Sequence, residues 1–555
     1  MSYLKRFLIF FISIILIIPI FYLATCYFFD LNIFTSLYIL EKIYKGLITG
    51  KDFHKDLYLV FGYAFIPFFI SVILLIEGKR DHKYGNAKWA NTRDILKSPL
   101  NFKEGFILAK FGNKLLRAND GQSMLIVAPP GAGKTSSIAV PNLLTLRNSM
   151  VVLDIKGELD DMCGNYRREV LKNKVLIFNP YNPKDNTIKF NPFDKSIIEK
   201  LEFHERLQLV NQISNILFLV EKGVDPHWSN SAKSLFVFFA LFSLESKGFT
   251  TFNELMRYPK LGTKELIADE KERERIKELE EEGLEVDVLS RFFLSVGENK
   301  EFTSIIRDKA YALSRIHTKE MSSIISSYTL AMIIFENPNV EKITDSNNFE
   351  VLDLRKEKIT IFIKVKEIDV KILGSLIRVL LDFIANNLMQ KESRGDDERV
   401  YFILDEFVRF GKMEKFLELP ALSRSYNIPA IYITQTEAQI EKYYSKEDLR
   451  IITGNVRYRV FFTMNDYESA EKFSKEIGNL TRDKISNSAQ SGKFGSNKNV
   501  SDEGYALITA QMLLNLNSDE VIISATGSKS RPIKAKVNYF FKNRYMRKII
   551  KKYQK

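Results

Sequence analysis

The sequence predicts an α/β fold that follows a membrane anchor and is interrupted by a helical segment. Three observations support this prediction. Two N-terminal stretches without charged residues are long enough to cross a bilayer. Further along, an apolar strand leads through a glycine-rich loop into a helix, over residues 123–146. A second apolar strand ends in two adjacent acids, Asp405 and Glu406, which is typical of an α/β site at strand ends.

Length and composition limit the possible classes of protein. At roughly 150 residues per domain, 555 residues have room for about three to four domains. The 45% hydrophobic and 27% charged residues exclude a chain that is disordered as a whole. Two cysteines cannot build a disulfide framework, and no Cys or His residues stand at zinc-ligand spacing. Eleven Lys and Arg follow Glu520 with no acid among them, so charge indicates an acidic partner only for this end.

The two uncharged stretches, 7–29 and 57–76, are predicted membrane spans, because about 20 helical residues cross ~30 Å of hydrocarbon. Flanking Lys and Arg residues favour a cytoplasmic position for both ends of the pair. We therefore expect a multi-pass protein of the inner cell membrane, with the large remainder in the cytoplasm. The alternatives are a core helix at the second stretch, and a cleaved signal peptide or lipoprotein-type box ending at Cys26 for the first.

A phosphate-binding loop is predicted at residues 128–135, Ala-Pro-Pro-Gly-Ala-Gly-Lys-Thr. It follows the pattern GxxxxGK[ST], except that Ala128 replaces the first glycine. The two glycines let backbone amides turn toward phosphate, Lys134 would reach the β- and γ-phosphates, and Thr135 would hold Mg²⁺. A glycine-rich turn that binds no nucleotide is the alternative. The residues expected to bind ATP are Pro130, Gly131, Ala132, Gly133, Lys134, Thr135 and Ser136.

The acid pair after the strand at 400–404 is the expected partner of this loop. Asp405 would orient the shell of the magnesium ion, and Glu406 would polarise the attacking water. Asp154 also follows an apolar strand, but a second acid does not come directly after it. Asp154 therefore either forms a strand-end turn or lines the site.

Two further residues complete the predicted catalytic set with Lys134 and Glu406. Gln435 ends the strand at 428–434, where a lone amide can sense the γ-phosphate or simply cap the strand. Arg424 precedes that strand, where it could stabilise the phosphoryl group across a subunit boundary or pair with a surface acid.

In their order along the chain, these motifs resemble the type IV secretion system coupling proteins, the TraG/TraD-like family of conjugative DNA-transfer ATPases. The shared pieces are the two spans, 128–135, Val140–Leu144, Asp154–Glu158, Asp225–Trp228, Leu404–Phe407, Ser423–Ile428, Gln435 and Arg531–Ile533. Ala128 departs from the family's usual glycine. The basic end departs from the acidic tail of some relatives, so contacts through such a tail are not carried over.

The resemblance implies a membrane-anchored homo-hexamer with a RecA-like core that hydrolyses ATP. It also implies a substrate, either single-stranded DNA bound to a relaxase or an effector protein, that is delivered to a type IV secretion channel. Channel proteins and membrane lipid are the other implied partners. Two alternatives remain: a docking receptor that uses nucleotide only to assemble its ring, and a septal-type DNA translocase.

The expected domains are a membrane anchor at 1–80, an ATPase domain at 81–195 and 346–541, an all-α insert at 196–345, and a basic tail at 542–555. The charge run at 264–285 is interpreted as a solvated helix face. A mobile loop is predicted over 481–504 and a strand over 533–541. The tail is a helix or a disordered end that could contact DNA phosphates, anionic lipids or only solvent.

Overall fold

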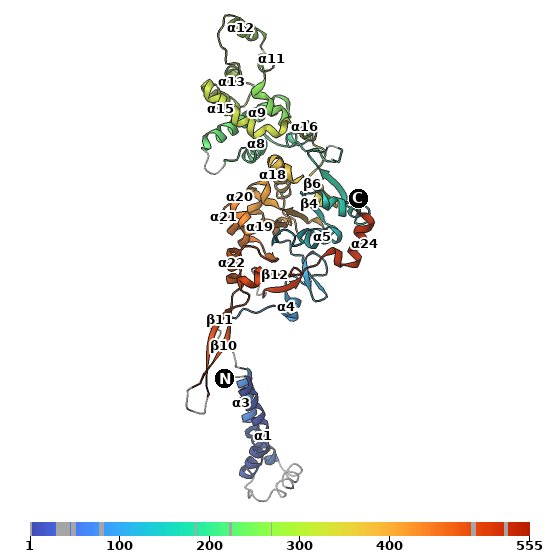
Figure 1. The fold of residues 1–555 in the computed structure, drawn as a ribbon, viewed down its shortest axis with the longest axis vertical. Helices are drawn as coiled ribbons and strands as arrows, with labels where there is room; N and C mark the ends of the chain where they lie inside the picture. Colours follow the sequence, from blue (N-terminus) through green and yellow to red (C-terminus); the bar gives the residue numbers. More distant parts are fainter. Residues whose placement is uncertain are drawn as a thin grey trace. The chain divides into compact units, whose positions relative to one another are not determined.

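The computed structural model describes residues 3–28, 41, 45, 51–76, 83–182, 184–185, 187–220, 225–267, 269–489, 496–526 and 531–555 (Figure 1). Its internal contacts divide the chain into two units, which are described separately. The first unit contains residues 1–85 and 481–504, and the second contains residues 86–480 and 505–555. The second unit is a mixed α/β structure, as the sequence predicts.

Two long helices, α1 (Tyr3–Phe28) and α3 (Lys51–Ile76), pack antiparallel in the first unit. The hydroxyl groups of Ser13 and Ser71 form a 2.8 Å hydrogen bond between them, so this polar pair is satisfied within the apolar interface. Aromatic rings pair along the rest of the interface: Phe10 with Phe68, Phe21 with Phe61, and Phe28 with Tyr63.

Among the described helices, one is long and apolar enough to cross a membrane. This stretch is Phe7–Phe28 in α1, with a mean hydropathy of 2.9. The apolar part of α3, Tyr58–Ile73, is shorter. The first predicted span is therefore supported by length and composition, and the second is not confirmed.

The segment at 481–504 differs from its prediction as a loop. Strands β10 (Asn479–Ala489) and β11 (Ser496–Ala506) form a two-stranded sheet, and residues 490–495 lie outside the described residues. Backbone hydrogen bonds between paired strands need no apolar side chains, so a polar segment rich in Ser, Asn and Gly carries no sequence signal for them.

Eleven strands of the described chain form one sheet in the second unit, in the order β2-β1-β13-β12-β9-β3-β8-β7-β4-β6-β5. The strands from β9 to β5 are parallel, and they are almost continuous buried apolar runs because helices cover both faces. The other four strands extend the sheet with antiparallel pairing. The bounds are β1 Phe106–Phe111, β2 Lys114–Ala118, β3 Met124–Val127, β4 Ser149–Asp154, β5 Lys174–Phe178, β6 Ile359–Lys364, β7 Val400–Asp405, β8 Ala430–Thr434, β9 Tyr458–Phe461, β12 Glu520–Ala525 and β13 Ile533–Lys536.

Successive side chains of the central strands enter two different cores. Leu125 packs in the core beneath α18, α19 and their neighbours, and Ile126 packs in the core beneath α5, α6 and α24. These helices and the others beside the sheet are α4 Thr92–Lys97, α5 Val140–Thr145, α6 Glu158–Glu169, α17 Asp353–Lys356, α18 Val370–Leu388, α19 Glu414–Tyr426, α20 Glu437–Tyr443, α21 Lys446–Asn455, α22 Tyr467–Ile477, α23 Ala510–Leu514 and α24 Arg544–Tyr553.

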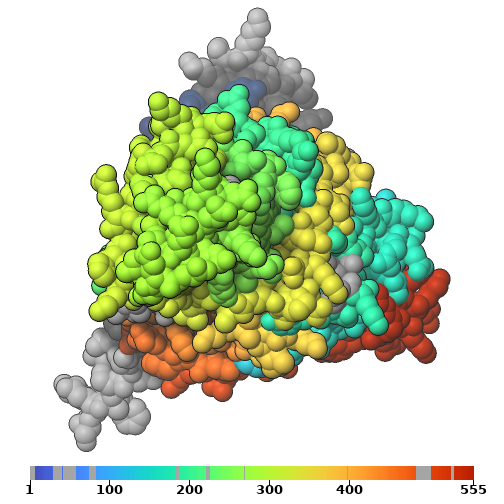
Figure 2. All heavy atoms as spheres, turned by 90° about the horizontal axis from the view of Figure 1, so that it is seen from above, coloured from blue at the N-terminus to red at the C-terminus, as the bar shows by residue number. Residues whose placement is uncertain are grey.

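Between β5 and β6 the described chain is helical, and these helices gather at one end of the second unit (Figures 1 and 2). Phe236 and Phe239 of α9 are fully buried at the centre of this segment. In α12, Ile276 is buried and the charged residues surround it, as a solvated helix face requires. The bounds are α7 Lys195–Ile198, α8 Phe203–Leu217, α9 Pro226–Lys247, α10 Phe252–Arg257, α11 Thr263–Leu266, α12 Glu270–Glu281, α13 Val288–Glu298, α14 Ser304–Ser314, α15 Thr318–Met332 and α16 Pro338–Thr344.

The C-terminal segment folds against the sheet. Strand β13 ends at Lys536, earlier than the predicted strand at 533–541, and a 3₁₀ turn, η7 (Phe540–Lys542), follows it. Helix α24 then buries Met546, Ile549 and Ile550 on one face, the spacing of an amphipathic helix. The basic tail is therefore a packed helix, and its charged residues lie on the solvent side.

Candidate functional site

The glycine-rich loop connects β3 to a short helical turn, η1 (Thr135–Ala139). Gly131 and Gly133 have φ values of 77° and 79°, left-handed conformations that favour glycine. Ala128 has no such conformation; its N–H donates to the Thr434 carbonyl at 3.0 Å, which continues the pairing of β3 with β8. Alanine therefore fits the position where this loop pattern usually has glycine.

The acid pair lies beside the lysine of this loop. Lys134 Nζ forms an ion pair with Glu406 Oε1 and lies 3.6 Å from Asp405 Oδ1. Strands β3, β8 and β7 are parallel neighbours, so their C-terminal ends meet at one edge of the sheet. Glu406 has a left-handed φ of 52°, and its N–H donates to the Ile433 carbonyl at 3.0 Å. This conformation is costly for glutamate and is typical of functional sites.

The two acids have opposite pKa shifts. Burial raises the pKa of Asp405 above its ordinary value, although the nearby Lys134 charge opposes this shift. Burial also acts to raise the pKa of Glu406, but hydrogen bonds from Lys134 and Gln435 outweigh it and lower the pKa overall. Glu406 is therefore ionised at neutral pH, the state in which a carboxylate can accept a proton.

Donors hold both carboxylate oxygens of Glu406. Gln435 Nε2 donates to Oε1 at 2.7 Å, the atom that Lys134 also contacts, and Arg409 Nε lies 3.1 Å from Oε2. Arg409 also donates from Nη1 to Glu367 Oε1 at 2.7 Å. Sequence reasoning missed Arg409, because an arginine three residues after an acid belongs to no motif by itself.

A cavity of about 560 Å³ opens at this edge of the sheet, within the size range of small-molecule sites. Ala132 and Arg424 are the predicted site residues that do not line it, and Arg424 is exposed on α19. The predicted residues that line it are Pro130, Gly131, Gly133, Lys134, Thr135, Ser136, Asp405, Glu406 and Gln435.

The cavity offers oxygen ligands that fit Mg²⁺. Thr135 and Asp405 both line it, and Asp405 Oδ1 is buried without a hydrogen-bond donor among the described residues. No group of three or more His, Cys, Asp or Glu side chains is placed to hold a metal in the described part of the chain. A nucleotide-bound magnesium ion usually has one or two protein ligands, and phosphate and water oxygens complete its coordination shell.

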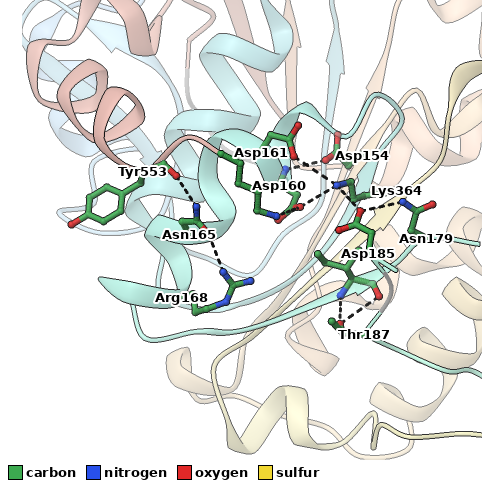
Figure 3. Close-up of polar contacts among 12 residues, drawn as sticks. Asp154, Asp160, Asp161, Asn165, Arg168, Asn179, Asp185, Thr187, Lys364 and Tyr553 are labelled. Carbon is green, nitrogen blue, oxygen red and sulfur yellow. Dashed lines mark hydrogen bonds and ion pairs between the residues drawn. The ribbon is translucent and has the colours of Figure 1, made fainter. Parts of the chain in front are cut away.

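Asp154 lines the cavity and also begins the turn after β4, where its carbonyl accepts a 3.3 Å hydrogen bond from the Gly157 N–H, so both sequence interpretations of this residue apply. Its Oδ2 accepts a 3.0 Å hydrogen bond from the Asp160 N–H. Burial raises the pKa of Asp154 to about 6, although backbone hydrogen bonds from Asp160 and Leu159 act to lower it. Outside the cavity lining, Figure 3 shows Lys364 of β6 between α6 and the segment after β5, with Nζ 3.1 Å from Asp160 Oδ2 and 2.9 Å from Asp185 Oδ2.

Comparison with known proteins gives the same assignment at the level of family. Residues 78–555 match the family model for type IV secretory system conjugative DNA transfer. Protein VirD4 of Rhizobium radiobacter is 26% identical over 500 residues, which cover 87% of this chain and 67% of that protein. Conjugal transfer protein TraG of Escherichia coli is 24% identical over 438 residues, which cover 72% of this chain and 65% of that protein.

Solved structures of the bacterial conjugative coupling protein TrwBdeltaN70 have a similar fold. The unbound form aligns with a TM-score of 0.59 and 14% identity, covering 83% of this chain and 95% of that one. TrwB in complex with the non-hydrolysable ATP analogue ADPNP aligns with a TM-score of 0.58, and TrwB with ADP and Mg²⁺ with 0.57.

Proposed function

Because the chain belongs to the type IV secretory system conjugative DNA-transfer family, we propose that it is a membrane-anchored ATP hydrolase that drives substrate into a secretion channel. The observation that carries this proposal is the contact of Lys134 with Glu406 inside the cavity. It joins the cation of a phosphate-binding loop to a carboxylate that is ionised and can activate water.

In the proposed reaction, the amides of the loop and Lys134 bind the β- and γ-phosphates, and Thr135 and Asp405 hold Mg²⁺. Mg²⁺ held by these two residues would supply positive charge that neutralises the phosphoryl oxygens. Lys134 exchanges Glu406 for the phosphates, which frees Glu406 Oε1 for water. Glu406 accepts a proton from that water while the water oxygen attacks the γ-phosphorus. The bond to the bridging oxygen breaks, leaving ADP and phosphate.

Gln435 and Arg424 have different proposed roles. Gln435 reads the γ-phosphate through its hydrogen bond to Glu406, since both groups would meet the same water. Arg424 is exposed and does not line the cavity of its own subunit. It would therefore reach only a nucleotide that is bound to a neighbouring subunit. This role requires a ring, which we propose is a homo-hexamer.

We place the protein in the inner cell membrane with both α1 and α3 as spans. The shorter apolar stretch of α3 is supported by its antiparallel packing on α1, including the bond between Ser13 and Ser71. A polar pair of this kind is favourable inside lipid, where water cannot replace either partner. The flanking Lys and Arg residues support a cytoplasmic ATPase domain.

The proposed cargo is single-stranded DNA bound to a relaxase, an effector protein, or both, passed to channel proteins of the type IV system. A docking receptor that uses nucleotide only for ring assembly is the second candidate. The acid pair favours hydrolysis over this second candidate, because assembly needs no group that activates water. The third candidate, a septal-type translocase, has no specific observation in its favour.

The deciding experiment uses the full chain, purified in detergent, and measures phosphate release from ATP with and without single-stranded DNA. We expect hydrolysis that increases when DNA is added. Binding of ATP without any phosphate release would support the docking receptor. An absence of ATP binding by correctly folded protein would exclude the proposal.

A further inference from the structure

One wall of the cavity is apolar and has no part in the hydrolysis chemistry. Val140, Met162 and Phe540 line it, together with the phosphate-binding loop. Met162 and Phe540 are half-buried and pack at the margin of the core beneath α5, α6 and α24. Partly exposed apolar groups inside a phosphate site indicate that the ligand has an apolar or aromatic part.

The order of the sheet separates this wall from the acids. Strand β13 is antiparallel to β12, which is antiparallel to β9, and β9 is parallel to β3. Strand β13 therefore ends at the same edge as β3, and Phe540 follows it there. In the sheet order β13 and β7 lie on opposite sides of β3. A ligand with its phosphates on the loop thus has Asp405 and Glu406 on one side and Phe540 on the other.

Tyr539 fixes the position of this wall against the loop. A Cβ atom placed on Gly133 would lie 2.5 Å from Tyr539 Cε1, so the ring packs directly over this glycine. The Tyr539 hydroxyl donates to the Ser518 carbonyl at 2.7 Å. The rings of Tyr539 and Phe541 stack, with centroids 4.9 Å apart, while Phe540 lines the cavity.

Helix α24 packs the segment that contains Phe540 against α6, which carries Met162 of the same apolar wall. Asn165 of α6 donates to the Tyr553 carbonyl at 3.1 Å, as Figure 3 shows, and the rings of Tyr166 and Tyr553 are 5.3 Å apart. Because α6 also carries Met162, these contacts connect the segment of Phe540 with the helix of Met162 through packed elements. The apolar wall is therefore built by packed elements rather than by a free chain end.

We propose that Phe540 binds the base of the nucleotide, by stacking on it, with Met162 completing an apolar slot and the buried Val140 lying behind it. The slot takes a nucleoside triphosphate whose phosphates lie on residues 131–136. This inference rests on the proposed nucleotide binding and adds a residue that no phosphate-loop motif contains. Stacking of a base on an aromatic ring contributes about 1–3 kcal/mol when measured by alanine substitution, which corresponds to about a 5- to 150-fold change in Kd.

The test compares ATP with inorganic tripolyphosphate, which has the phosphates and lacks the base. Binding of each is measured by calorimetry on the full chain in detergent. In Phe540→Ala we expect at least about a fivefold loss of ATP affinity and no change for tripolyphosphate. Phe249→Ala is the control, an exposed ring of the helical segment between β5 and β6 and outside the cavity lining, and should leave both affinities unchanged. Lys134→Ala should weaken both ligands.

A second variant gives a direct optical signal. Phe540→Trp keeps a stacking ring, so ATP affinity should be preserved and the added tryptophan emission should be quenched by ATP but not by tripolyphosphate. Unchanged ATP affinity in Phe540→Ala would overturn the base slot while nucleotide binding stands. Equal losses for both ligands would also overturn it, because Phe540 would then support only the loop. If the wild-type protein bound neither ligand, the proposed function itself would fail.

Discussion

Lys134 Nζ lies 3.6 Å from Asp405 Oδ1, a buried carboxylate oxygen with no hydrogen-bond donor among the described residues. The ammonium charge favours ionised Asp405, and burial disfavours it. Besides the phosphate contact proposed for it, Lys134 therefore neutralises charge on the acid pair in this structure. We therefore expect removal of Lys134 to affect both phosphate binding and the acid pair.

The variant Lys134→Ala tests both roles. We expect ATP affinity to fall by about 10²-fold or more, since a charge-assisted contact in a partly buried site is lost. Transfer of DNA by cells that carry the variant should be abolished, while the amount of protein in the membrane fraction should stay the same. Lys551→Ala, an exposed residue of α24, is the control. Normal transfer with Lys134→Ala would contradict the motor function.

The variant Glu406→Gln separates binding from chemistry. The amide keeps the size of the side chain but accepts no proton from water, so we expect phosphate release to fall by about 10²- to 10⁴-fold. ATP binding should be retained or tightened. Glu367→Gln, which removes a carboxylate that contacts Arg409 at the cavity margin, should cost far less. Equal rates for the Glu406 variant and the wild type would exclude Glu406 as the base.

The pH dependence of hydrolysis should report the contacts of Glu406. In the nucleotide-free protein, where Lys134 contacts it, Glu406 has a lowered pKa, so the acid limb of the kcat/KM profile, which reports the free enzyme, should lie below the ordinary value for glutamate. Arg409→Ala and Gln435→Ala remove groups that favour the charged form, so each should shift this limb to higher pH. A limb that does not move in either variant would show that another group controls the profile.

Asp154 and Asp185 should affect stability in opposite directions. The pKa of Asp154 is raised to about 6 by burial, so its contribution to stability is fully present below about pH 4 and is lost as pH rises through 6. Asp154→Asn should therefore raise the free energy of unfolding by up to ~3 kcal/mol at pH 7.5 and have little effect at pH 4. Thermal unfolding of the full chain at both pH values measures this difference.

Asp185 is the matched control for that measurement. Burial acts to raise its pKa, but hydrogen bonds from Lys364 and Asn179 lower it overall. Its contribution is present at neutral pH and is lost as pH falls through the lowered pKa. Asp185→Asn should therefore destabilise the protein at pH 7.5, the opposite sign to Asp154→Asn. The same sign for both variants would contradict the described arrangement around Lys364.

The membrane topology can be tested by labelling single cysteines in intact cells with an impermeant maleimide, in a background with Cys26 and Cys163 replaced. With two spans, a cysteine at Ser36 should be labelled from outside, and one at Ser98 should not. With one span, Ser36 and Ser98 should behave alike. Labelling after cell lysis shows that each site is reactive.

The site residues that could be predicted from the sequence belong to short motifs of consecutive residues. Glycines, lysine and threonine at 131–135 form one local pattern, and Asp405 and Glu406 end one apolar strand. Gln435 could be included because it ends another such strand. The strands that lead into these three segments, β3, β7 and β8, are neighbours in the sheet and parallel, so their C-terminal ends meet. The site could therefore be predicted without the order of the other strands.

The residues that were missed depend on contacts that no local pattern records. Arg409 contacts Glu406 because the left-handed conformation of Glu406 turns the chain at this point. Phe540 lies near the glycine-rich loop because two antiparallel pairings bring the end of β13 to the same edge of the sheet as the end of β3. The sheet at 479–506 was missed because its side chains are polar and only its backbone pairs. In these three cases tertiary structure decides the outcome.

The contact between Tyr539 and the phosphate-binding loop joins positions that are about 400 residues apart, the hydroxyl lying 3.3 Å from the Ala132 carbonyl 407 positions earlier. A nascent chain on the ribosome carries its glycine loop long before this aromatic side chain is made. The pocket therefore reaches its final shape only late in synthesis, and a truncated translation product would lack one wall of it.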